Sequence, residues 1–123
     1  MTTGKQLGQA LPADTNAVSI YSPPAAEIIT EIKTIIVTNV TSSNATCRIF
    51  HDDNGTTYST ATALVYDKTV LANDFFAIGF GEKDEGIWFE DSTGNLAIQS
   101  GTGSALNFTV YGIENNDDRD IRN

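Results

Sequence analysis

The residues of this chain that could act in catalysis lie close together in the sequence. The chain has one histidine, His51, and one cysteine, Cys47. A serine-hydrolase site needs a carboxylate that orients the histidine, and Asp52 and Asp53 directly follow His51. Adjacent residues of a strand point to opposite faces, so Asp52 cannot hydrogen-bond to His51 as that site requires. No Gly-x-Ser-x-Gly motif is present either. The sequence therefore predicts a protein that is not an enzyme.

Metal-binding patterns are equally sparse. Cys47 and His51 would share one face of a strand, but a zinc site needs further ligands. The segment Asp52-Asp53-Asn54 is rich in oxygen ligands, yet the residues after Gly55 do not continue as a calcium-binding loop. The acidic cluster Glu82–Glu85 fits a hydrated loop tip. We therefore expect no metal and no cofactor.

A carbohydrate-binding module is a further hypothesis, because the aromatic residues could form a sugar platform. Trp88 and Phe89 precede the acidic pair Glu90 and Asp91, and three more phenylalanines lie nearby in the sequence: Phe75, Phe76 and Phe80. Hydrolysis of a glycoside would require two carboxyl groups facing each other across a cleft, and nothing in the sequence marks a cleft. We expect these aromatic side chains to divide between the core and a subunit interface.

The elements that would carry these residues are short β-strands separated by Gly, Asn and Asp turns. Such spacing predicts an all-β protein, an antiparallel β-sandwich with a jelly-roll-like arrangement of about eight short strands. The Ile-rich run 28–40 predicts a central strand covered on both faces. Asn54-Gly55 predicts a type I′ hairpin, with 56–60 as its returning strand. The other expected strands are 16–21, 45–51, 63–66, 69–71, 75–80, 87–89, 96–99 and 106–113.

Composition restricts the partners and the domain organisation. The net charge of −9 comes from 16 acidic and 7 basic residues, which argues against binding to nucleic acid or to an anionic membrane. A single cysteine excludes an intramolecular disulfide, and no apolar run is long enough to cross a membrane. We expect an extended N-terminal arm (1–15), a sandwich domain (16–113) and a flexible acidic tail (114–123).

Six short segments, taken in order, resemble a known group of proteins. They are Lys5-Gln6-Leu7-Gly8-Gln9-Ala10, Ser19-Ile20-Tyr21-Ser22-Pro23-Pro24-Ala25, the Ile-rich run ending at Thr38-Asn39, Arg48-Ile49-Phe50-His51-Asp52-Asp53, Leu71-Ala72-Asn73-Asp74, and Phe108-Thr109-Val110-Tyr111-Gly112-Ile113-Glu114. Together they are similar to the small β-sandwich structural proteins of tailed-bacteriophage particles, over positions 5 to 114. The acidic loop 81–86 and the tail have no counterpart in this resemblance.

The resemblance implies a virion part, made in the host cytoplasm and located on the capsid surface. It implies a decoration or cement protein that binds the major capsid protein or another virion protein as a symmetric homo-oligomer, with a trimer favoured. A tail, adaptor or fibre component is the alternative within the group. An extended arm suits strand addition to a neighbour's sheet. The residues expected at the interface are Lys5, Gln6, Leu7, Gln9, Leu11 and Trp88.

Overall fold

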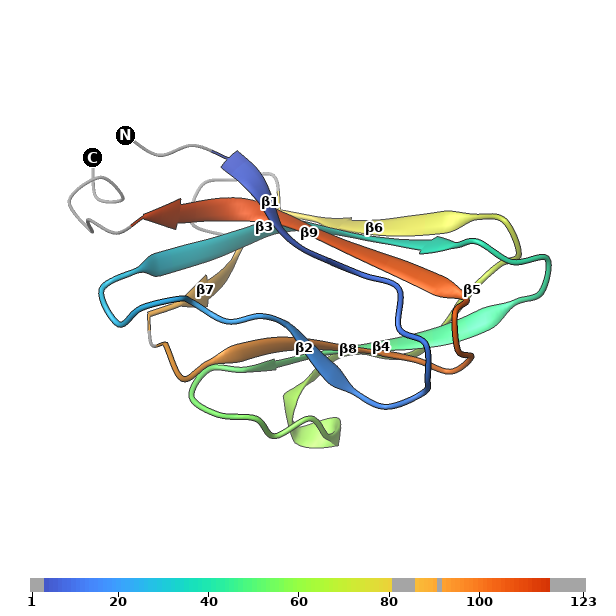
Figure 1. Cartoon of the computed structure of the whole chain (residues 1–123), viewed down its shortest axis with the longest axis horizontal. Helices are drawn as coiled ribbons and strands as arrows, with labels where there is room; N and C mark the ends of the chain where they lie inside the picture. The colour runs from blue at the N-terminus through green and yellow to red at the C-terminus, as the bar shows by residue number, and fades with distance from the viewer. Residues whose placement is uncertain (1–3, 81–85, 91, 116–123) are drawn as a thin grey trace.

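Two antiparallel sheets pack face to face in the computed structural model, which describes residues 4–80, 86–90 and 92–115 (Figure 1). We call them sheet A, with the strand order β1-β9-β3-β6 and β7 also paired to β3, and sheet B, with the order β2-β8-β4-β5. The strands are β1 (Gly4–Ala10), β2 (Val18–Tyr21), β3 (Ile29–Asn39), β4 (Ala45–Asp52), β5 (Ala63–Val70), β6 (Phe75–Gly79), β7 (Ile87–Phe89), β8 (Asn95–Ser100) and β9 (Leu106–Asn115).

The strand pairs are nested. β1 pairs with β9, β2 with β8, β3 with β6, and β4 with β5, all antiparallel. The chain therefore folds like one long hairpin rolled across two sheets, which is the jelly-roll arrangement. This confirms the predicted antiparallel, jelly-roll-like sandwich, in which β7 is a short addition between β6 and β8.

The core lies between the sheets and follows the alternation of the strands. Ile35 and Val37 of β3 and Phe108 and Val110 of β9 are fully buried, and so is Ile49 of β4 in the facing sheet. Burying side chains of this size stabilises a fold by about 1.5–3 kcal/mol each. β3 is central in sheet A, as predicted.

The prediction that β3 is covered on both faces holds near its start and was wrong from Thr34 onward. Its outward side chains Thr34, Ile36 and Thr38 are only half-buried. The reason is that sheet B packs against the inward face of sheet A only; at the start of β3, where β7 pairs with it, Thr30, Glu31 and Ile32 are all buried. The Ile-rich composition reflects the propensity of β-branched residues for strands, not burial on both sides.

Part of the segment expected to form an arm is paired within the sandwich. Gly4–Ala10 forms β1, which lies along β9 at the edge of sheet A. Extended backbone needs hydrogen-bond partners, and the edge of β9 supplies them in the same chain. The register shifts between Gln6 and Gly8, so Gln6 and Gln9 both face outward, and the amide of Gln6 donates a 2.9 Å hydrogen bond to Gln9.

The prediction of a type I′ hairpin at Asn54-Gly55 was wrong. None of the described glycines has a positive φ, and the strand that returns along β4 begins at Ala63. A longer loop containing the 3₁₀ turn Thr60–Thr62 joins the strands. The carboxylate of Asp52 organises this loop by accepting hydrogen bonds from the backbone N–H groups of Asn54 (3.1 Å) and Thr57 (2.9 Å). A side-chain acceptor thus takes the place of the expected glycine turn.

The end of the domain differs slightly from the prediction. β9 continues to Asn115, so Glu114 belongs to a strand and not to the tail. Residues 116–123 of the predicted tail and the acidic residues Glu82–Glu85 lie outside the described residues. No helix in the described ranges has the length and apolar character needed to cross a bilayer.

Candidate functional site

The groups that could have carried chemistry are built into the sandwich. The ring of His51 lies 4.7 Å from that of Phe89, edge to face, and its Nε2 is buried without a hydrogen-bond partner in the described structure. Burial lowers the pKa of His51, against the opposing effect of Asp53 and Asp52. Cys47 is buried, and burial raises its thiol pKa to about 11. The thiolate is the reactive form of cysteine, so a thiol kept protonated at neutral pH is a poor nucleophile.

The carboxylates beside His51 have structural partners. The N–H groups of Thr57 and Asn54 lower the pKa of Asp52 by hydrogen-bonding to its charged form. Asp52 therefore acts as a loop acceptor. Among the described residues, no three histidine, cysteine or acidic side chains are placed to hold a metal ion.

The aromatic residues proposed as a sugar platform are separated by the fold. Phe89 is fully buried in the core, whereas its neighbour Trp88 is half-buried on the other face of β7. Trp88 lies opposite Glu31, and Phe75 lies opposite Thr38. Seven residues of β3 separate these positions, which corresponds to about 23 Å at ~3.3 Å per residue. Trp88 and Phe75 therefore do not form one platform.

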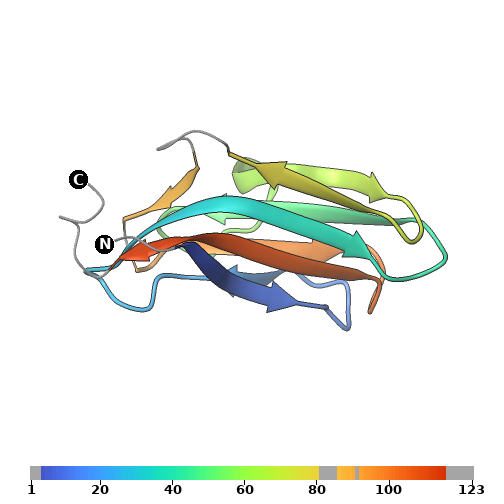
Figure 2. The same cartoon turned by 90° about the horizontal axis from the view of Figure 1, so that it is seen from above.

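Figure 2 looks onto sheet A, in which β1, β9, β3 and β6 lie side by side. Part of the outer face of this sheet carries no charged side chain. The register places Thr38 beside Phe75 and Asn107, Ile36 beside Ala77 and Thr109, and Thr34 beside Gly79 and Tyr111. β1 extends the surface, because Gln9 pairs with Thr109 and Gln6 with Tyr111. We call this set the neutral face: Gln6, Gln9, Thr34, Ile36, Thr38, Phe75, Ala77, Gly79, Asn107, Thr109 and Tyr111.

Large apolar side chains of the neutral face are open to solvent. Phe75 is 60% exposed and Tyr111 39%, and Ile36 is half-buried between them. Charged pairs flank the neutral face on both sheets: Lys33 and Glu31 pair at the other end of β3, and Arg48 and Asp67 pair on sheet B. The neutral face is thus an uncharged surface four strands wide on a chain with a net charge of −9.

The structure does not bring the six predicted interface residues together on one surface. Gln6 and Gln9 belong to the neutral face, whereas Leu7 packs partly against the core. Lys5 forms an ion pair with Glu114, 2.8 Å between Nζ and Oε1. Leu11 follows β1 and is 49% exposed. Trp88 is on β7, separated from β1 by β3 and β9.

Sequence reasoning missed the residues that dominate the neutral face. Phe75 and Tyr111 were placed in strands but not on a common surface, because that requires the pairing register of β6, β3 and β9. One sequence signal was available: the outward positions of run 28–40, at Thr34, Ile36 and Thr38, are all uncharged.

Comparison with models of known protein families gives no match to this chain. Comparison with curated proteins gives no significant match.

Proposed function

We propose that this chain is a non-enzymatic structural protein of a bacteriophage particle, a decoration protein that binds the head shell as a symmetric oligomer. The observation that carries the proposal is the neutral face. The cores of protein interfaces are depleted of charged residues and enriched in aromatic ones, and this face has no charge and exposes Phe75 and Tyr111. Its partner is the repeating protein surface of the shell. The resemblance to phage structural proteins over positions 5 to 114 supports the same assignment.

The charge distribution supports docking through this face. Copies of a chain with a charge of −9 repel one another and repel other acidic surfaces. Placing the uncharged side against the shell leaves the charged residues toward solvent, which limits unspecific association. The jelly roll is used by viral capsid proteins among others, although a fold alone does not determine function.

The size of the neutral face indicates that a second surface takes part. Four strands about 4.8 Å apart and five residues at ~3.3 Å each cover a few hundred Å². A stable interface of ordinary size buries roughly 800 Å² on each partner. We therefore propose that β1, whose Gln6 and Gln9 already belong to the face, adds a second contact by pairing with a neighbouring subunit.

β1 is suited to exchange between subunits. Its inward apolar side chains are Leu7 and Ala10, both only partly buried. It is also held by the backbone ladder with β9, the ion pair of Lys5 and the close approach of Gly8 to Ile20 of β2. A neighbour's β9 offers the same ladder, so exchange conserves the hydrogen bonds while linking subunits. In this proposal β1 pairs with β9 of its own chain when the protein is free. In the oligomer, which is a trimer, β1 pairs with β9 of a neighbouring subunit.

The shell contact is tested by placing a charge on the neutral face. Particles of the phage that encodes the chain, assembled without it, are mixed with purified protein, and the bound fraction is measured by co-sedimentation. Thr38→Glu lies on the face beside Phe75 and should reduce binding at least tenfold. The matched control is Leu64→Glu, at an exposed position of β5 in sheet B, which should bind like wild type. An equal loss of binding in both variants contradicts the proposal, and so does wild-type binding in both. Binding to tails and not to heads would instead assign the chain to the tail or an adaptor.

Strand exchange is tested by a disulfide across the β1–β9 pair. Gln6 and Tyr111 are direct partners in the register, and the variant Gln6→Cys/Tyr111→Cys is made with Cys47→Ser to remove the native thiol. Oxidation of the shell-bound protein should give covalently linked subunits if β1 is exchanged. Linkage within single chains only would contradict exchange.

A further inference from the structure

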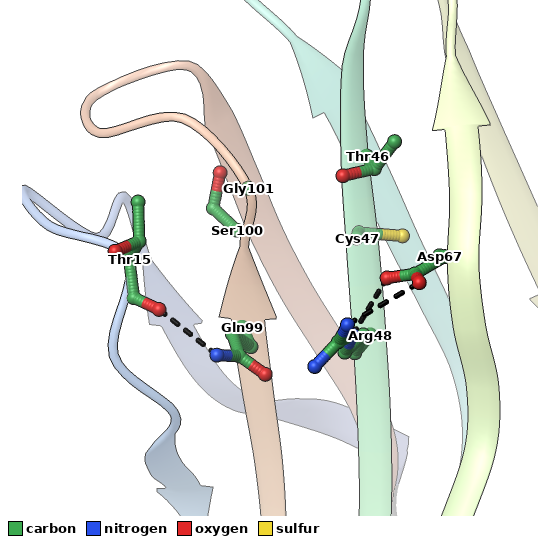
Figure 3. Close-up of a pocket in the computed structure, with 8 residues that line it drawn as sticks. All are labelled: Thr15, Thr46, Cys47, Arg48, Asp67, Gln99, Ser100 and Gly101. Carbon is green, nitrogen blue, oxygen red and sulfur yellow. Dashed lines mark hydrogen bonds and ion pairs between the residues drawn. The ribbon is translucent and has the colours of Figure 1, made fainter.

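A hollow of about 230 Å³ lies on the outer side of sheet B, away from the neutral face (Figure 3). Its lining includes Gln99 of β8 and Thr46 of β4, together with Thr15, in the segment before β2, and Gly101, after β8. Segments distant in the sequence thus meet at one polar depression.

One wall of the hollow is a guanidinium fixed in place. The Nε of Arg48 lies 2.6 Å from one carboxylate oxygen of Asp67, and its Nη2 lies 3.2 Å from the other. The ring of Tyr66 supports the guanidinium from a further side, with 4.1 Å from Cζ to the ring centroid. The remaining nitrogen, Nη1, makes no hydrogen bond to the described residues. Arg48 therefore presents a free donor whose position is set by its neighbours.

The backbone of β5 is distorted to make this arrangement. Asp67 has a φ of 55°, in the left-handed region that a non-glycine residue seldom adopts. The register with β4 shifts at the same point, between Cys47 and Ile49. A bulge of this kind redirects a side chain, and here it turns the carboxylate of Asp67 toward Arg48.

The opposite wall presents a free acceptor. The Nε2 of Gln99 donates a 2.9 Å hydrogen bond to the carbonyl oxygen of Thr15, which fixes the amide and leaves its Oε1 available. Thr46 contributes a hydroxyl that has no hydrogen-bond partner in the described structure. It lies under Gly101, where a Cβ would come within 2.3 Å of its Oγ1, so only a glycine leaves the hydroxyl this room.

These features select the class of ligand. Asp67 compensates the charge of Arg48, and a net charge of −9 disfavours anions. A fixed donor beside a fixed acceptor matches a hydroxyl group, which both donates and accepts. Ligand pockets for larger molecules measure about 300–1,000 Å³, and this hollow is smaller. We propose that it binds one ring of a neutral sugar, through hydroxyl groups that bridge Arg48 Nη1 and Gln99 Oε1.

The experiment is a titration of ¹⁵N-labelled protein, followed by amide chemical shifts. The probes are methyl α-D-glucopyranoside, methyl α-D-mannopyranoside, methyl β-D-galactopyranoside and N-acetylglucosamine. At least one of them should shift the signals of Gln99, Gly101 and the Arg48 side chain with a saturable, millimolar-range curve. Sodium sulfate at the same concentration as the sugars should leave these signals in place.

Variants separate the site from unspecific effects. Arg48→Lys removes the fork that pairs with Asp67, and Thr46→Val replaces a hydroxyl by a methyl group of similar size; each should weaken binding at least tenfold. Leu64→Ser, on β5 outside the hollow, is the control and should bind like wild type. The proposal is overturned if no probe produces saturable shifts, if both variants bind like wild type, or if sulfate shifts the same signals more than the sugars do.

Discussion

The hydroxyl of Tyr21, on β2, donates a 2.5 Å hydrogen bond to Oε2 of Glu114, near the end of β9. The same hydroxyl shares a 2.6 Å hydrogen bond with Thr30 of β3, so it joins sheet B to two strands of sheet A. Burial, reinforced by Glu114, raises the pKa of Tyr21 and keeps its proton in place. Burial alone would raise the pKa of Glu114. The hydrogen bonds from Lys5 and Tyr21 outweigh this effect, so the pKa of Glu114 is lowered.

Removing the Tyr21 hydroxyl should therefore destabilise the sandwich. Tyr21→Phe leaves a partly buried carboxylate with one partner fewer, and we expect a loss of about 1–3 kcal/mol in the free energy of unfolding, measured by urea denaturation. The control is Tyr66→Phe, because Tyr66 is exposed on β5, and its loss should stay within about 0.5 kcal/mol. Equal losses in the two variants would show that the hydroxyl bridge between the sheets contributes nothing.

The attachment of β1 depends on a glycine. A Cβ at Gly8 would lie 2.6 Å from the carbonyl oxygen of Ile20, in β2. Gly8→Ala should therefore displace β1, costing about 1–3 kcal/mol, and hydrogen exchange should accelerate in Gly4–Ala10. The matched change Gly4→Ala meets its nearest atom at 3.9 Å and should leave exchange unaltered. Unchanged protection in Gly8→Ala would contradict the close approach of β1 and β2.

Stability should depend on His51 at mildly acidic pH. Burial lowers the pKa of His51 below its ordinary value of 6.5, so the unfolded chain takes up a proton first. The free energy of unfolding should then fall as pH drops below about 6.5, until the folded-state pKa is passed, and should not vary with this group above about pH 7.5. His51→Gln should abolish this slope. His51 is the one histidine of the chain, so a slope that persists in the variant would contradict the assignment.

The loop after β4 should depend on Asp52. Asp52→Ala removes the acceptor of two backbone N–H groups, and we expect a loss of about 1–3 kcal/mol. Asp53→Ala changes an exposed neighbour and should alter stability by at most about 0.5 kcal/mol. Thermal unfolding of both variants above pH 6 measures the difference. A wild-type melting temperature in Asp52→Ala would favour a loop organised by other contacts.

Strand composition predicted most of the fold, because β-branched runs between turn residues mark strands whatever their partners. The run 28–40 became β3 almost as expected. The sequence could not predict that the face of β3 that carries Ile36 would stay partly exposed, because this depends on what packs against the sheet. It also misled at Asn54-Gly55, where the acceptor at Asp52 organises a longer loop in place of a tight turn.

The candidate surfaces were harder to predict than the strands. Phe75, Ile36 and Tyr111 come from three strands, and only the register of β6, β3 and β9 places them on one face. The hollow on sheet B depends on the unusual backbone of Asp67, a residue that no turn signal identified. Periodicity reports on single strands, whereas both surfaces arise from pairing between strands.

The most direct test of the central claim is a cryo-microscopy reconstruction of an intact particle of the phage that we propose encodes this chain. We expect symmetric copies on the head shell, with Phe75 and Tyr111 buried against a neighbouring protein and the outer face of sheet B toward solvent. A particle that lacks the chain, or one in which Phe75 and Tyr111 face solvent, would contradict the proposal.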